Sequence, residues 1–335
     1  MSILTNEQVK YFEREGYVLV RNLLDPEKVL DPLIREYELV LDQLATTLHN
    51  KGEISSLSEE LDFSDRMIEI VKESGNCHAQ YFDMHLPIKD CTPSTPFWTG
   101  PAVFNVLTSD NLLDAVESLI GSEIYSNPIQ HVRIKPPERF VPKNKYGEPI
   151  LGRTIWHQDH GVTTVEADKT QMLTVWMSLQ NATVEKGPLL VVPRSHKTGL
   201  LTHCPNYFGN GLATAGQTQI PEKLFDAEKS LPLPTKRGDV IFMHKQTVHG
   251  SLPNLSNEVR WSLDLRYNPI GQATGRSIFP GFVARSRVAP KSVLRDAEEW
   301  NNMWLRTRKK ISLMNQGEED AFRRTRWDGG QLECA

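Results

Sequence analysis

Cysteine is scarce in this chain, and the four residues present are far apart in the sequence. Cys77, Cys91, Cys204 and Cys334 include no Cys-x-x-Cys pair. Without that spacing neither a zinc knuckle nor a disulfide framework is indicated, and the few thiols fit a reducing cytosol. We therefore expect structural or surface thiols in a cytoplasmic protein.

Long apolar runs, a net positive charge and internal repeats are also missing. No run of about 18 apolar residues is present, so no transmembrane helix is expected. The first residues lack a basic segment followed by an apolar one, so no secretory signal is expected. A formal net charge of −4 gives no reason to expect nucleic acid or an anionic membrane as partner. A hydrophobic fraction of 39% instead indicates an ordinary globular chain.

The chain changes character along its length. Residues 1–120 read as mostly helical, beginning with a capping box at Thr5 and a stop at Gly16. Residues 121–270 carry short segments of strand character, and residues 271–335 return to helix before a polar tail. The predicted central strands are 126–135, 153–157, 172–179, 189–192, 240–244 and 260–267. Gly, Pro and Asn residues lie between these segments, and short strands separated by such turn residues are typical of an antiparallel barrel or sandwich. We expect a single catalytic domain, mainly β with helical additions.

Two stretches, 136–152 and 200–234, fit neither helix nor strand. Loops of this length in a compact domain are more often functional lids than passive connectors. We therefore expect both to border the functional site, without deciding which one closes over it.

A His-x-Asp triplet, His157-Gln158-Asp159, is the first candidate for metal binding. Alone it is weak, because about 0.5 such triplets are expected from composition by chance. If 153–157 is a strand, side chains two residues apart point to the same side and can reach one ion. The alternative is a strand-end histidine bonded to the neighbouring aspartate. His249 follows a turn and an apolar strand at 238–242, which can deliver it from the opposite side of a barrel. Two histidines and one carboxylate form the facial triad of non-haem Fe(II) oxygenases.

Arg260 begins a segment with clean alternation. Residues 260, 262, 264 and 266 are polar, whereas 261, 263, 265 and 267 are apolar or aromatic. This pattern predicts one polar face and one packed face. A buried arginine on the polar face needs a partner, and a dicarboxylate would serve. The alternative is a structural ion pair of Arg260 or Arg266 with Asp264.

The combined motifs resemble the phytanoyl-CoA hydroxylase family, which includes ectoine hydroxylase. They are WHQDHG at 156–161, GDVIFMHKQTVHGS at 238–251, the arginine eleven positions after His249, Lys135-Pro136-Pro137, and the segment 187–196. The resemblance covers roughly residues 5 to 270.

This resemblance implies a double-stranded β-helix core, a jelly-roll of the cupin kind, flanked by N- and C-terminal helices. It implies Fe(II) bound by His157, Asp159 and His249. It also implies 2-oxoglutarate as co-substrate with dioxygen.

The resemblance further assigns 2-oxoglutarate to Arg260 and Ser251, with Trp176 packed beside it. A plain core tryptophan is the competing interpretation of Trp176. His131 and Arg133 match positions that in relatives approach co-substrate or substrate. Either could instead be a surface strand residue.

The implied reaction is hydroxylation of an unactivated carbon with release of succinate and carbon dioxide. Related halogenases carry a small residue where Asp159 stands, so hydroxylation is favoured over halogenation. The substrate is expected to be a small metabolite, with secondary metabolism as an analogy from family breadth. Nothing indicates a CoA thioester or an oligomeric state. A cupin-type metal-dependent isomerase or lyase without 2-oxoglutarate, and a non-catalytic binding protein of the same fold, remain alternatives.

Overall fold

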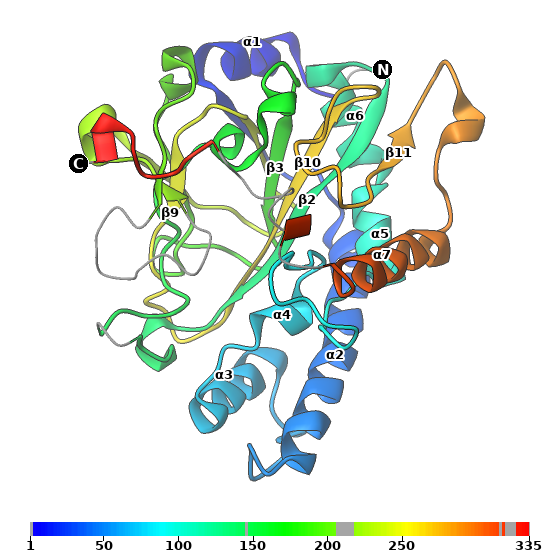
Figure 1. The fold of residues 1–335 in the computed structure, drawn as a ribbon, viewed down its shortest axis with the longest axis vertical. Helices are drawn as coiled ribbons and strands as arrows, with labels where there is room; N and C mark the ends of the chain where they lie inside the picture. Colours follow the sequence, from blue (N-terminus) through cyan, green and yellow to red (C-terminus); the bar gives the residue numbers. More distant parts are fainter. Residues whose placement is uncertain (1–2, 145–146, 206–217, 315–316, 319–325, 335) are drawn as a thin grey trace.

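The computed structural model describes residues 3–144, 147–205, 218–314, 317–318 and 326–334 (Figure 1). Part of the predicted lid 200–234 and two residues of the predicted lid 136–152 therefore lie outside the described residues. Among the described helices, none has both the length and the apolar character needed to cross a membrane.

Antiparallel strands form the centre of the molecule (Figure 1). A six-stranded sheet has the order β1 (Tyr17–Val20), β8 (Val240–His244), β3 (Leu173–Ser178), β10 (Arg260–Pro269), β2 (Ile124–Lys135) and β11 (Phe282–Arg285). A three-stranded sheet has the order β7 (Leu231–Leu233), β4 (Leu189–Val191) and β9 (His249–Ser251). A further pair joins β5 (Cys204–Pro205) to β6 (Thr218–Gln219).

The helices surround the six-stranded sheet: most share a hydrophobic core with one of its faces, and the first packs along its edge strand β1. They are α1 (Asn6–Glu15), a π-helical turn (Pro26–Leu30) leading into α2 (Asp31–Asn50), α3 (Phe63–Ser74), α4 (Ala79–Phe82), α5 (Pro101–Leu107), α6 (Asp110–Ile120) and α7 (Ala297–Ile311). Short 3-10 turns lie at Glu138–Phe140, Asp159–Val162, Val165–Ala167, Ser195–Thr198, Glu222–Leu224, Ala227–Lys229, Pro290–Ser292 and Leu332–Cys334.

The alternation predicted for 260–267 is confirmed and explains the layering. Trp261, Leu263 and Leu265 belong to the large core shared with the helices. Trp261 stacks on Phe63 of α3 with ring centroids 4.5 Å apart. The opposite face of the sheet looks toward the small sheet, where Trp176 packs with apolar residues of both sheets. The predicted jelly-roll arrangement of mainly antiparallel sheets with added helices is confirmed, although the sheets do not close into a continuous barrel.

The first helix is also as predicted. Thr5 accepts a hydrogen bond from the Gln8 backbone, while the Gln8 side chain accepts one from the Thr5 backbone. Gly16 ends the helix with φ +82°, a left-handed conformation that favours glycine. A Cβ there would also lie 2.3 Å from the His196 ring. Both the backbone conformation and the lack of space therefore require glycine at this position.

Two predictions are wrong. Residues 153–157 form no strand; His157 alone makes an isolated bridge with His249. The expectation that all four cysteines are free is contradicted by a disulfide between Cys204 and Cys334, which are 130 residues apart. Cys77 and Cys91 are free and buried. No spacing rule could detect a bond that depends on how the chain's end folds back.

Candidate metal centre

His157, Asp159 and His249 meet in the structure. Their ligand atoms all lie within 4.8 Å of one another. The Nε2 atom of each histidine is 3.9 Å from an Asp159 carboxylate oxygen. Two backbone hydrogen bonds of 3.0 and 2.9 Å join His157 to His249 across their bridge. Asp159 opens a 3-10 turn, so a turn rather than a strand brings the carboxylate to the histidines.

Both imidazoles are oriented by the backbone. Nδ1 of His157 donates to the Ile155 carbonyl at 2.8 Å, and Nδ1 of His249 donates to the Thr247 carbonyl at 2.9 Å. Each ring therefore turns Nε2 toward Asp159, and a donating Nδ1 leaves Nε2 as the nitrogen that would bind a metal. Burial, with His249 close by, lowers the pKa of His157 to about 3, so this ring stays neutral at neutral pH.

The Asp159 carboxylate is held from both sides. Arg266 donates to Oδ1 and Thr174 donates to Oδ2. Burial alone would raise the pKa of Asp159, but Arg266 and the two histidines outweigh it, so the pKa lies well below its usual range. Each oxygen keeps lone pairs for a metal ion, and hydrogen bonds of this kind commonly orient a ligating carboxylate. The predicted alternative, an Arg266–Asp264 ion pair, is absent among the described residues.

Arg260 is buried on the interior face of β10. It is 2% exposed, and its guanidinium donates to Ser262 Oγ at 2.6 Å. Its Nε has no hydrogen-bond partner, and among the described residues no carboxylate lies within ion-pair distance. The guanidinium lies 5.8 Å from the centroid of the Trp176 ring. Burial lowers the pKa of Arg260 to about 10, so it remains a cation at neutral pH.

Lys135 stands directly opposite Arg260 in the pairing of β2 with β10. Its Nζ donates to Ser251 Oγ at 3.2 Å, to Thr154 Oγ1 at 2.8 Å and to the Gly152 carbonyl at 2.8 Å. Burial, with Arg260 close by, holds its pKa well below the usual range. Ser251, predicted to bind 2-oxoglutarate with Arg260, is thus hydrogen-bonded to Lys135. Sequence reasoning missed this lysine, although it shares the alternation of His131 and Arg133.

His131 and Arg133 follow along the same face of β2, but each has a carboxylate partner. Arg133 pairs with Asp264 of β10. His131 Nδ1 lies 2.8 Å from an Asp83 oxygen. Neither is a fully exposed surface residue of the kind considered as the alternative, because the side chains of His131 and Arg133 are 23% and 33% exposed. His131 also packs against His85, with ring centroids 4.8 Å apart.

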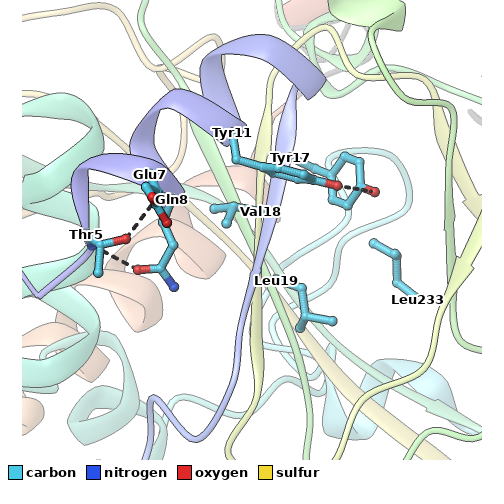
Figure 2. Close-up of a pocket in the computed structure, with 8 residues that line it drawn as sticks. All are labelled: Thr5, Glu7, Gln8, Tyr11, Tyr17, Val18, Leu19 and Leu233. Atoms are coloured by element: carbon cyan, nitrogen blue, oxygen red, sulfur yellow. Dashed lines mark hydrogen bonds between the residues drawn. The ribbon is translucent and has the colours of Figure 1, made fainter.

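A separate pocket of about 410 Å³ lies between α1 and β1 (Figure 2). The Tyr11 and Tyr17 hydroxyls, 3.0 Å apart, form part of its wall, and Leu233 borders it from β7. None of the predicted site residues lines this pocket. It is therefore distinct from the triad.

Comparison with known sequences gives a family match. A model described as phytanoyl-CoA dioxygenase (PhyH) matches residues 12–262. Phytanoyl-CoA dioxygenase domain-containing protein 1 of Danio rerio is 22% identical over 267 residues, covering 78% of this chain and 88% of that protein. Phytanoyl-CoA dioxygenase 1 of Oryza sativa subsp. japonica is 24% identical over 265 residues, with 78% and 88% covered.

Solved structures share the fold. The non-heme monooxygenase ThoJ, in its apo form, aligns with a TM-score of 0.55 at 15% identity, covering 94% of this chain and 100% of that chain. EctD from S. alaskensis, solved with 2-oxoglutarate and 5-hydroxyectoine, aligns with a TM-score of 0.51 at 18% identity, covering 80% and 77%. At these identities the likeness shows the fold alone.

Proposed function

The chain belongs to the phytanoyl-CoA dioxygenase (PhyH) family, and from this premise we propose that it is an Fe(II)- and 2-oxoglutarate-dependent oxygenase that hydroxylates a small metabolite. Family membership makes it an oxidoreductase. The observation that carries the proposal is the triad, in which two Nε2 atoms and one ionised carboxylate converge while every other polar atom of the three side chains is occupied.

His157, Asp159 and His249 would hold the iron. Their donor set fits a ferrous ion, because imidazole and carboxylate ligands on one face leave coordination positions for a co-substrate and dioxygen. When bound, the ferrous centre supplies the activation of dioxygen. The protein's contribution would be to orient both imidazoles, to keep His157 neutral and to keep the carboxylate charged before any metal arrives.

Arg260 would bind the far carboxylate of 2-oxoglutarate. Its planar fork matches a carboxylate, and its Nε has no partner in the structure. Lys135 lies directly opposite Arg260 in the strand pairing and orients Ser251. Trp176 forms an apolar wall against the guanidinium. A dianionic co-substrate is the ligand that this buried positive charge favours.

Substrate would meet the interior at the His131 end of β2. Because His131 and Arg133 already carry carboxylate partners, we propose that they shape the wall of the site rather than bind an anionic group. The expected products are the hydroxylated metabolite, succinate and carbon dioxide. A role in secondary metabolism, a cytoplasmic location and action as a single catalytic domain are parts of this proposal.

The decisive experiment is an anaerobic titration of the metal-free protein with Fe(II) and 2-oxoglutarate. The proposal predicts a visible metal-to-ligand charge-transfer band in the wild type and none in His157→Ala. A folded, metal-loaded protein without the band would instead indicate a cupin-type isomerase or lyase that does not use 2-oxoglutarate. A folded protein that binds no metal would indicate a non-catalytic binding protein.

A further inference from the structure

The C-terminal segment 326–334, called the tail segment below, lies against the loop that carries two of the metal ligands. This ligand loop comprises residues 157–162. Figure 1 shows the tail segment on the side of the sandwich near β9, away from α7. The Trp327 indole donates to the Gly161 carbonyl at 2.8 Å, and Arg326 pairs with Asp168 just beyond the loop. Cys334 closes the disulfide with Cys204.

His203, adjacent to Cys204, joins the tail segment to the ligand loop. Its Nε2 accepts a hydrogen bond of 2.9 Å from the backbone amide of Gln158, the residue between His157 and Asp159. Its Nδ1 donates to the Leu201 carbonyl at 2.8 Å, which fixes this tautomer. Burial lowers the pKa of His203 to about 4, so Nε2 remains an acceptor at neutral pH.

The side chain of His203 is tightly packed. His203 is 0% exposed, and its ring stacks on Trp327 with centroids 5.2 Å apart. A Cβ at Gly161 would lie 2.3 Å from the His203 ring, so the ligand loop is in direct contact with the histidine. Movement of His203 would therefore be transmitted to the ligand loop.

We propose that the tail segment, fastened by the Cys204–Cys334 disulfide, is a redox-sensitive device that positions the metal ligands through His203 and Trp327. The inference rests on the proposed function, because it assumes that His157 and Asp159 bind metal. His203 and Trp327 are positioning residues, since they touch the ligand loop and no ligand atom. When the disulfide is intact, the tail segment holds His203 against the Gln158 amide. When the disulfide is reduced, His203 is no longer held and the amide loses its fixed hydrogen-bond partner.

The chemistry is a thiol–disulfide exchange. A dithiol supplies two electrons and two protons, the bond between the Cys204 and Cys334 sulfurs breaks, two thiols form, and the dithiol becomes a cyclic disulfide. In a reducing compartment such bonds are usually transient or redox-sensing. Metal affinity would then follow the thiol redox state of the surroundings.

The test measures Co(II) affinity of the metal-free protein without co-substrate, before and after dithiothreitol. Loss of partners that orient ligands typically weakens metal affinity about 10- to 100-fold. We expect a loss in this range for His203→Leu, and a loss near its lower end for Cys334→Ser and for reduced wild type. His203→Gln, which restores an acceptor, should recover most of the affinity. Cys77→Ala removes a buried free thiol and is the matched control.

Hydrogen exchange at the Gln158 amide is the second readout. Cys334→Ser and reduction should each speed this exchange, whereas Cys77→Ala should not. Equal Co(II) affinity and equal Gln158 protection with and without the disulfide would overturn the proposal, even if His203→Leu fails to fold. Peptide mapping that finds Cys204 and Cys334 as free thiols in protein purified without reductant would also overturn it. A wild-type protein that binds no Co(II) would contradict the proposed function itself.

Discussion

Arg260 illustrates how one residue can be prepared for a ligand. It is fully buried, its Nε is unbonded, and Ser262 is its hydrogen-bond partner. We expect Arg260→Ala to raise the apparent KM for 2-oxoglutarate by at least about 30-fold, because a lost charged hydrogen bond costs about 2 kcal/mol. Fe(II) affinity should change little. Steady-state kinetics and metal titration check both statements.

Arg260→Lys separates charge from geometry. It keeps the positive charge but loses the planar fork, so we expect an intermediate KM. Arg287→Ala, at an exposed ion pair with Glu117, is the control and should leave KM unchanged. Unaltered 2-oxoglutarate affinity in Arg260→Ala would show that the carboxylate binds elsewhere.

The sequence pattern indicated which residues are candidates for the site better than it indicated which side chains they contact. The alternation correctly placed Arg260 and Arg266 on one face of the strand. Neither arginine forms the ion pair with Asp264 that was considered as the alternative, because Arg133 of the neighbouring strand binds that carboxylate. Arg266 instead reaches Asp159, 107 residues away. The period of a sequence pattern predicts on which face of a strand a side chain lies. The residue that this side chain contacts depends on the register between strands, and a local sequence pattern holds no information on that register.

At the scale of elements, Asp239 joins the edge strand β1 to β8. Its buried carboxylate accepts from the Asn22 amide at 2.9 Å, from the Lys236 amide at 2.8 Å and from Arg21 at 2.6 Å. We expect Asp239→Ala to lower the free energy of unfolding by about 3 kcal/mol, because several donors lose a charged acceptor. Urea unfolding followed by circular dichroism measures it.

Two further variants make this prediction specific. Asp239→Asn retains one acceptor and should cost less than the alanine variant. Asp226→Ala breaks an exposed, solvent-screened pair with Lys229 and should leave stability nearly unchanged. If Asp239→Ala proved as stable as Asp226→Ala, the hydrogen bonds of Asp239 that join β1 to β8 would make no contribution to stability.

Element predictions succeeded where a segment carries its own signal. The strand 240–244 matches β8, and the first helix begins and ends at its caps. The strand proposed at 153–157 failed because only His157 forms a β-bridge, whereas Thr154 and Trp156 each accept a single backbone hydrogen bond, from Ser251 and Ile220. β9 has three residues and was too short for any period to reveal.

For the whole molecule, buried neutral histidines set the response to acid. Burial lowers the pKa of His203 and of His244 to about 4, below the 6.5 of an exposed histidine. Between these values the unfolded chain binds more protons than the folded one, so stability is present above pH 6.5 and is lost as pH falls toward 4.

We therefore expect the thermal midpoint of the metal-free protein to fall between pH 6.5 and 4. The fully buried His203 alone contributes roughly 3 kcal/mol over this window. His203→Gln, which cannot titrate, should show a shallower pH dependence than the wild type. Equal slopes for the two proteins would show that His203 does not control the acid response.

The tail segment marks the limit of prediction at this scale. Its composition indicated only a polar end, and cysteine spacing indicated no disulfide. The contacts of Trp327 with His203 and Gly161 join parts of the chain more than 100 residues apart. Only the assembled fold brings them together.

The Asp159 carboxylate, bonded on one oxygen by Arg266 and on the other by Thr174, cannot rotate about its last bond. A ligand whose rotation is already restricted gives up little conformational entropy when a metal ion arrives. The cost of ordering this side chain is met when the turn that carries Asp159 packs against β3 and β10 during folding. Metal affinity in this protein is thus partly a property of the folding reaction, set before the ion is encountered.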